Sequence, residues 1–147
     1  LDVYVANATS GGFGTMLEMG PEMWEAAVRL NIIGNAMAIK HAGRVMRDHG
    51  GGSFVAISST SATKVQPWLS PYVTTKHALD MMVRCAAIEL PRGLRINAVS
   101  STVFVEAWEA YGEFFPGYKP VPVQEAGLAF LKSVSGAQTG QVYRVGY

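Results

Sequence analysis

Short apolar runs alternate with longer helical patterns along this chain, and that order constrains its fold more than any other feature. The runs with the length and bounding turn residues of strands are 2–7, 53–58, 94–99 and 141–145. The stretches with helical patterning are 21–48, 72–90 and 122–131. Strands that are connected through helices pair in parallel. The 147 residues therefore predict one domain of the α/β class, in which helices flank a parallel sheet and run 2–7 is a buried strand.

The charge balance argues against polyanionic partners. The net charge is +1, and no run of Lys and Arg forms a basic patch for nucleic acid or for an acidic membrane surface. No apolar run approaches the ~20 residues that span a bilayer. We therefore expect no nucleic-acid partner and no membrane partner.

The sequence contains one cysteine and three histidines. Cys85 cannot form an internal disulfide, which fits a reducing compartment such as the cytoplasm, and its apolar surroundings predict a buried, inert thiol. His41, His49 and His77 have no metal-ligand spacing, so we expect helix-surface histidines and no metal site.

The helix that begins near Ser70-Pro71 carries a Tyr and a Lys at helical spacing. Pro71 suits the first turn of a helix, and Ser70 before it can act as the cap. Tyr72 and Lys76 are four residues apart, so their side chains lie on one helix face. A tyrosine phenol has a pKa of ~10 in water, and a nearby ammonium lowers this pKa because it favours the phenolate. The pair can therefore act as a general acid or base, and a solvated surface pair is the alternative.

The context of this pair resembles the short-chain dehydrogenase/reductase family. Ser59 follows the apolar strand 54–57 and precedes Tyr72 at the family's spacing, and Asn31 matches the asparagine of the family's fourth core helix. The segments similar to other strands and turns of the family, in the family's order, are 1–8, 93–99 and 139–142. The resemblance implies a Rossmann-like doubly wound sheet.

The resemblance also implies a reaction and its residues. The protein would transfer a hydride between NAD(P)(H) and a ketone or secondary alcohol, with Tyr72 as general acid/base. Lys76 would lower the pKa of Tyr72 and bind the ribose of the cofactor. Ser59 would bind the substrate oxygen, and Asn31 would hold a water of a proton relay through its backbone carbonyl. For Asn31, an ordinary polar role inside its helix is the alternative.

Further cofactor contacts implied by the resemblance are Asn7 and Phe104. Asn7 would tie the turn after the first strand near the cofactor, or it is a simple turn former. Backbone groups near Phe104 would contact the nicotinamide carboxamide. The sequence does not distinguish NAD from NADP, because the family reads the adenosine ribose in a segment before the equivalent of Leu1. We therefore expect the sequence to be incomplete at its start.

The chain departs from the family pattern after the strand at 94–99. Ser101-Thr102 stands where Pro-Gly is usual, which indicates either a rebuilt loop or a join between two pieces. Glu106 stands where a phosphate-binding threonine is common, and a carboxylate would repel a pyrophosphate. The aromatic residues of 104–118 form either a lid over an apolar substrate or part of the core.

Quaternary structure and function both have alternatives. In the family the two long helices form the subunit interface, which implies a homodimer or homotetramer; a helix fully buried within a monomer is the alternative. The rivals to the dehydrogenase are a scaffold protein, which the Ser101-Thr102 loop favours, and a sugar-nucleotide epimerase or dehydratase, which the short C-terminal part disfavours.

Overall fold

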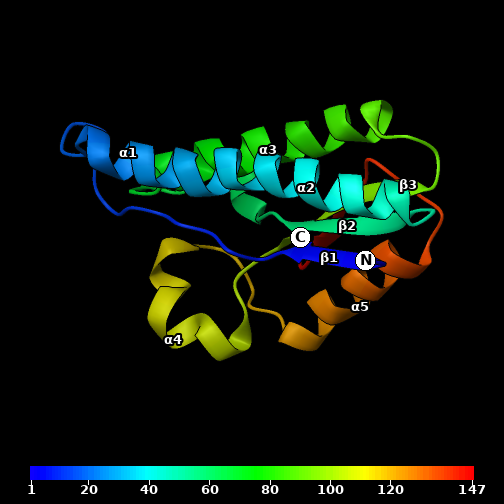
Figure 1. Ribbon diagram of the computed structural model, residues 1–147. Helices are drawn as coiled ribbons and strands as arrows, with labels where there is room; N and C mark the ends of the chain where they lie inside the picture. Colours follow the sequence, from blue (N-terminus) through cyan, green and yellow to red (C-terminus); the bar gives the residue numbers. More distant parts are fainter.

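The computed structural model describes residues 1–147, and its centre is one four-stranded parallel sheet in the order β1-β2-β3-β4. The strands are β1 (Val3–Ala6), β2 (Gly52–Ile57), β3 (Leu94–Ser101) and β4 (Val142–Val145). A helix lies between each pair of consecutive strands, so the predicted α/β class is confirmed (Figure 1).

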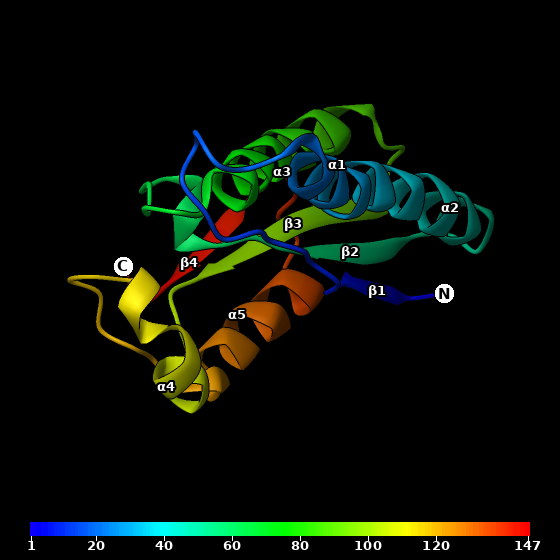
Figure 2. The same ribbon diagram turned by 90° about the vertical axis from the view of Figure 1, so that its left-hand side faces the viewer.

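Helices cover both faces of the sheet (Figures 1 and 2). On one face α1 (Pro21–Val28), a π-helical segment η1 (Arg29–Gly34) and α2 (Asn35–Asp48) form one continuous rod beside α3 (Ser70–Glu89). On the other face lies α5 (Val123–Ser135). The remaining elements are short: η2 (Thr60–Ala62), η3 (Val105–Ala107), α4 (Trp108–Tyr111) and η4 (Gly112–Phe114).

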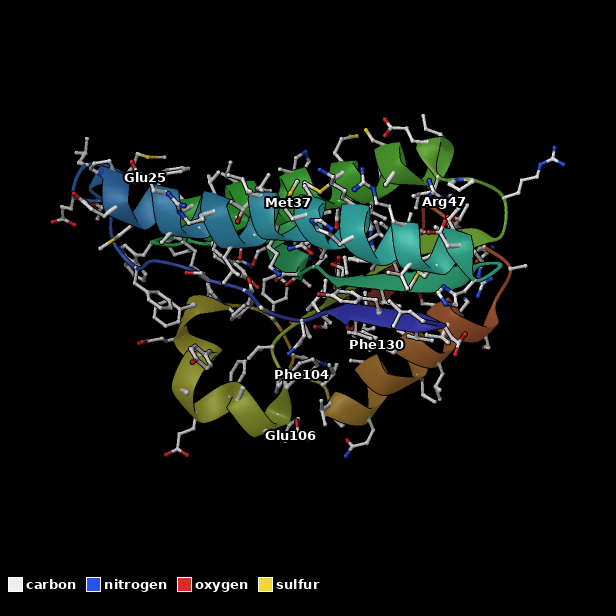
Figure 3. All side chains as sticks on the ribbon, viewed as in Figure 1. Glu25, Met37, Arg47, Phe104, Glu106 and Phe130 are labelled. Carbon is white, nitrogen blue, oxygen red and sulfur yellow. The ribbon has the colours of Figure 1, made fainter.

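Two hydrophobic clusters lie on the two faces of the sheet. Side chains alternate along β2, so Phe54 and Ala56 join the cluster under α2 and α3, whereas Val55 joins the cluster under α5. Figure 3 shows Phe130 between α5 and the sheet, where it packs against the Val55 cluster. Because β2 and β3 are buried from both sides, the ends of these strands are firmly positioned.

The expectation that the first strand is buried is wrong. β1 pairs with β2 alone and is an edge strand, so Val3 and Val5 are 39% and 44% exposed. Only its other face packs, with Tyr4 stacked on Phe54 at a ring-centroid distance of 5.0 Å.

Two local predictions about the helices also need correction. Ser70 is the first residue of α3 rather than its cap; Leu69 stands at the cap position, and no side chain caps the helix. Cys85 is exposed, because it lies on the solvent side of α3. The three histidines are exposed as predicted. None of the helices combines the length and the apolar character required to cross a bilayer.

Candidate active site

A cavity of about 460 Å³ opens where β2 and β3 end at their carboxyl termini. Its lining includes Ile57, Ser58 and Ser59 after β2, and residues 101–104 at the end of β3. Tyr72, from the first turn of α3, also lines it. The carboxyl edge of a parallel sheet is where open α/β folds bind ligands, because loops there diverge around a crevice.

One side of this cavity is aromatic. We call the following residues the aromatic wall: Phe13, Phe104, Tyr111, Phe114 and Phe115. Phe13, from the loop after β1, and Phe114, from η4, pack with tilted rings at a centroid distance of 4.6 Å, which joins the loop after β1 to the segment after β3. No charged side chain lines the cavity.

Ser59 and Tyr72 face each other across the polar side of the cavity. Ser59 Oγ accepts the Ser61 N–H at 3.2 Å and lies 3.1 Å from Ser61 Oγ. Burial raises the pKa of the Tyr72 phenol, and the hydrogen bond with Ser59 lowers it by less. The net shift of the Tyr72 pKa is therefore upward, opposite to the lowering expected from Lys76, and the phenol is protonated at neutral pH.

Lys76 is 2% exposed, one turn along α3 from Tyr72. Its Nζ donates to the Ile57 carbonyl at 2.6 Å and lies 5.4 Å from the centroid of the Tyr72 ring. Burial lowers the pKa of this ammonium to about 8, and the negative charge of Asp80 raises it by less. The lysine is thus held between the end of β2 and the tyrosine ring.

Asn31 lies in the π-helical segment and is 1% exposed. Its amide donates to the Ser10 carbonyl at 2.7 Å and to Thr75 Oγ1 at 2.8 Å, and its Oδ1 accepts from Ser10 N at 2.8 Å and from Thr9 Oγ1 at 3.1 Å. The side chain thereby fastens the loop after β1 to α3. Its backbone carbonyl, the predicted water ligand, accepts from Asn35 Nδ2 at 2.9 Å.

Two of the other predicted residues lie apart from this group. Asn7 is exposed, makes no side-chain hydrogen bond and does not line the cavity. Phe104 lines it and forms an isolated parallel bridge with Val121. Glu106 is exposed on the outer side of the segment (Figure 3), where its carboxylate accepts from Val123 N at 3.3 and 3.4 Å and so caps α5.

The family model described as enoyl-(acyl carrier protein) reductase matches residues 1–144. The chain belongs to the short-chain dehydrogenase/reductase family. Relatives include an uncharacterised NAD-dependent oxidoreductase of Mycobacterium tuberculosis, 35% identical over 148 residues, which are 92% of this chain and 54% of that protein. Human dehydrogenase/reductase SDR family member 4 is 34% identical over 102 residues, which are 68% of this chain and 37% of that protein.

Solved structures of the family share the fold. The protein lin1944 from Listeria innocua is 31% identical and has a TM-score of 0.90, over 98% of this chain and 71% of that one. A gluconate 5-dehydrogenase from Burkholderia cenocepacia, in complex with NADP and tartrate, has a TM-score of 0.88 at 23% identity. The match covers 99% of this chain and 63% of that one. These neighbours confirm the Rossmann-like fold, and the chain spans about half the length of the curated relatives it matches.

Sequence reasoning missed several residues of this short-chain dehydrogenase/reductase site. Thr9 and Thr75 bind Asn31, and Asp80 acts on Lys76. Asp80 follows Lys76 by four residues, the spacing that revealed Tyr72, so the same periodicity could have found it. No sequence periodicity could have revealed Thr9, because its partner Asn31 is remote in sequence. No group of three His, Cys, Asp or Glu side chains could hold a metal ion.

Proposed function

We propose that the protein is an NAD(P)-dependent oxidoreductase that interconverts a ketone and a secondary alcohol. The observation that carries the proposal is the meeting of Ser59 and Tyr72 at one cavity, at the carboxyl edge of the sheet, with Lys76 buried beside the Tyr72 ring. The names of its relatives, among them NAD-dependent oxidoreductases, support the same reaction class.

The lining supports an uncharged, apolar substrate. The aromatic wall presents large apolar surfaces, and a charged group would be desolvated there without a partner. The only polar side chains deep in the cavity are hydroxyls, and these suit a single oxygen of the substrate.

The proton chemistry follows from two hydroxyls. In the reducing direction Ser59 donates a hydrogen bond to the carbonyl oxygen, where negative charge develops. Tyr72 donates its proton to the same oxygen and becomes a phenolate, and the ammonium of Lys76, close to the ring, favours that charge. In the oxidising direction Tyr72 accepts the proton as the phenolate, and its raised pKa means that this form is populated only at high pH.

The site suits the nicotinamide end of the cofactor, which when bound supplies or accepts the hydride. No carboxylate faces the cavity, and Thr102 Oγ1 is buried there without a hydrogen-bond partner. Lys76 would donate to ribose hydroxyls, and the backbone at Phe104 would meet the carboxamide. Asn7 stays a proposed contact of the turn after β1.

Two measurements test the function. NADH and NADPH are titrated into the protein while fluorescence quenching and thermal shift are followed, and turnover of a panel of apolar and charged ketones is read at the nicotinamide absorbance. We expect binding of at least one dinucleotide and turnover of apolar ketones. No response to either dinucleotide would favour a scaffold protein instead.

We also propose that the two long helices form a subunit interface in a homodimer or homotetramer. Apolar side chains on the outer surface of η1, α2 and α3 support it: Ile33, Met37, Val45, Met81 and Ile88 are exposed. Their exposure is inconsistent with a helix pair fully buried within a monomer. Sedimentation of the protein and of Met37→Glu tests the interface; an unchanged oligomer would contradict it.

The single domain and the cytoplasmic location remain proposals. One sheet with a cluster on each face supports a single domain. The free, exposed thiol of Cys85 supports a reducing compartment.

A further inference from the structure

Asp80 is a buried carboxylate that the proposed reaction does not use. It is 7% exposed and lies one turn beyond Lys76 on the same face of α3. It forms no ion pair, and its Oδ1 makes no hydrogen bond. A charge removed from water without a partner is costly, so a carboxylate in this position calls for an explanation.

The groups around Asp80 connect it to the site. Ser58, at the end of β2, has a buried hydroxyl without another partner and lies close enough to the carboxylate to lower its pKa, although burial raises that pKa by more. Arg84, His77 and Lys76, all on α3, lower it further. His77 Nδ1 is already 2.8 Å from the Ala62 carbonyl, and Arg84 is exposed. Lys76 is therefore the only fully buried cation that acts on Asp80.

We infer that Asp80 is a positioning residue that keeps the buried Lys76 side chain charged beside Tyr72. The inference rests on the proposed function. Lys76 Nζ has one hydrogen bond in the protein, to an uncharged carbonyl, and the only titratable groups that face it are Tyr72 and Asp80. Without a negative charge nearby, a buried ammonium loses its proton more readily.

The consequence can be measured on Lys76 itself. The pKa of Lys76 is about 8 in the wild type, so it is sensitive to a small change of its surroundings. If Asp80→Asn moves the midpoint to about 7, the charged fraction at pH 8 falls from about one half to about one tenth. Turnover at pH 8 then falls about fivefold relative to turnover at pH 6.

The experiment is an NMR titration of lysine 13Cε in wild type, Asp80→Asn and the control Asp48→Asn, with the Lys76 signal identified by its loss in Lys76→Arg. Asp48 is an exposed carboxylate on α2, so its removal subtracts the same charge far from the site. We expect the Lys76 midpoint and the alkaline limb of the pH–rate profile to move down only in Asp80→Asn. Should that variant not fold, Asp80→Ser gives the same comparison.

The outcomes separate the inference from the function. A Lys76 midpoint unchanged in Asp80→Asn overturns the inference, even if the enzyme is active. Absence of ketone turnover in the wild type overturns the proposed function, whereas the titration still reports on Asp80. A general loss of rate with an unchanged pH profile would assign Asp80 a merely structural role.

Discussion

The two sides of the cavity are built in different ways. The polar side, which we call the polar floor, comprises Ser59 and Tyr72, which line the cavity, with Lys76 and Asn31, which hydrogen-bond to the lining residues Ile57 and Thr9. These four residues are carried by the long helices and the end of a central strand. The aromatic wall is carried by loops and by helices of three or four residues that contain no buried residue. Asn31 alone makes four side-chain hydrogen bonds, whereas the segment that carries most of the wall is joined to the rest by the isolated bridge of Phe104 with Val121 and the long hydrogen bonds of Glu106 to Val123 N.

This difference indicates a division of tasks. Proton transfer requires groups held within a hydrogen-bond length of one another, and multiply bonded elements provide this. Selection of an apolar substrate requires area and shape, and a loosely attached aromatic segment can provide these. Substitutions in the polar floor should therefore change rate constants, and those in the aromatic wall should change apparent affinity.

The largest effect is expected for Tyr72→Phe, which removes only the phenol oxygen. We expect kcat for ketone reduction to fall by about 10²–10⁴-fold, because the general acid is lost, while the thermal midpoint changes little. Tyr143→Phe, which removes a hydroxyl bound to Gln138 outside the cavity, is the control. A full rate in Tyr72→Phe would show that the polar floor does not supply the general acid.

Lys76→Met should change stability in a pH-dependent way. The pKa of Lys76 is lowered in the folded state to about 8 from 10.5, so between these values the unfolded chain binds more protons and stability rises with pH. The total rise is on the order of 3 kcal/mol. Above pH 10 the raised pKa of Tyr72 acts in the opposite direction, because the folded state then holds the proton longer.

Urea unfolding of wild type and Lys76→Met between pH 7 and pH 10 measures the contribution of Lys76 to the free energy of unfolding. The difference in unfolding free energy between Lys76→Met and wild type should shrink as pH rises, since the Met side chain carries no charge to desolvate. A constant difference across this range would show that Lys76 is solvated, against its 2% exposure.

Asn31→Ala should destabilise the fold by about 2–3 kcal/mol, because it removes four side-chain hydrogen bonds and leaves the partly buried backbone N–H and carbonyl of Ser10 without these partners. Asn7→Ala is the matched control: the same change at an exposed side chain without hydrogen bonds should cost less than about 0.5 kcal/mol. Denaturant midpoints compare them. Equal losses of unfolding free energy in Asn31→Ala and Asn7→Ala would show that the hydrogen bonds of Asn31 do not stabilise the polar floor.

The smallest effect is expected for Phe114→Ala in the wall. Loss of the ring contact with Phe13 should cost about 1 kcal/mol of stability. KM for apolar ketones should rise several-fold with kcat nearly unchanged, and Phe114→Leu should restore part of the affinity. A fall in kcat as large as that of Tyr72→Phe would contradict the division of tasks.

The polar floor could be predicted from the sequence because its geometry follows from helical spacing. Tyr72 and Lys76 share a helix face, and Ser59 lies two residues after the end of β2. The contacts of Asn31 could not be predicted, since Thr9, Ser10 and Thr75 come together only in the folded chain. The direction of the Tyr72 pKa was missed because burial, which the sequence does not report, outweighs the neighbouring charge.

The aromatic wall illustrates the same limit. The sequence left open whether residues 104–118 form a lid or a core; in the structure several of them line the cavity and Tyr111 remains half exposed. Glu106, considered as a group that would repel phosphate, instead caps α5 from outside the cavity. Local patterning does not encode either placement.

The π-helical segment Arg29–Gly34 sets the rotational phase between the two halves of the long helical rod. A regular α-helix turns by about 100° per residue, and the wider π turn takes up about one extra residue, so winding the same residues as a regular α-helix would rotate α1 against α2 by roughly that angle. Ala42 and Met46 could then stay in the core only if Ala27, and Asn31 beside it, left their present contacts. Regular winding of these residues would thus separate the packing of the sheet from the assembly of the cavity, although every side chain that lines the cavity remains in the sequence.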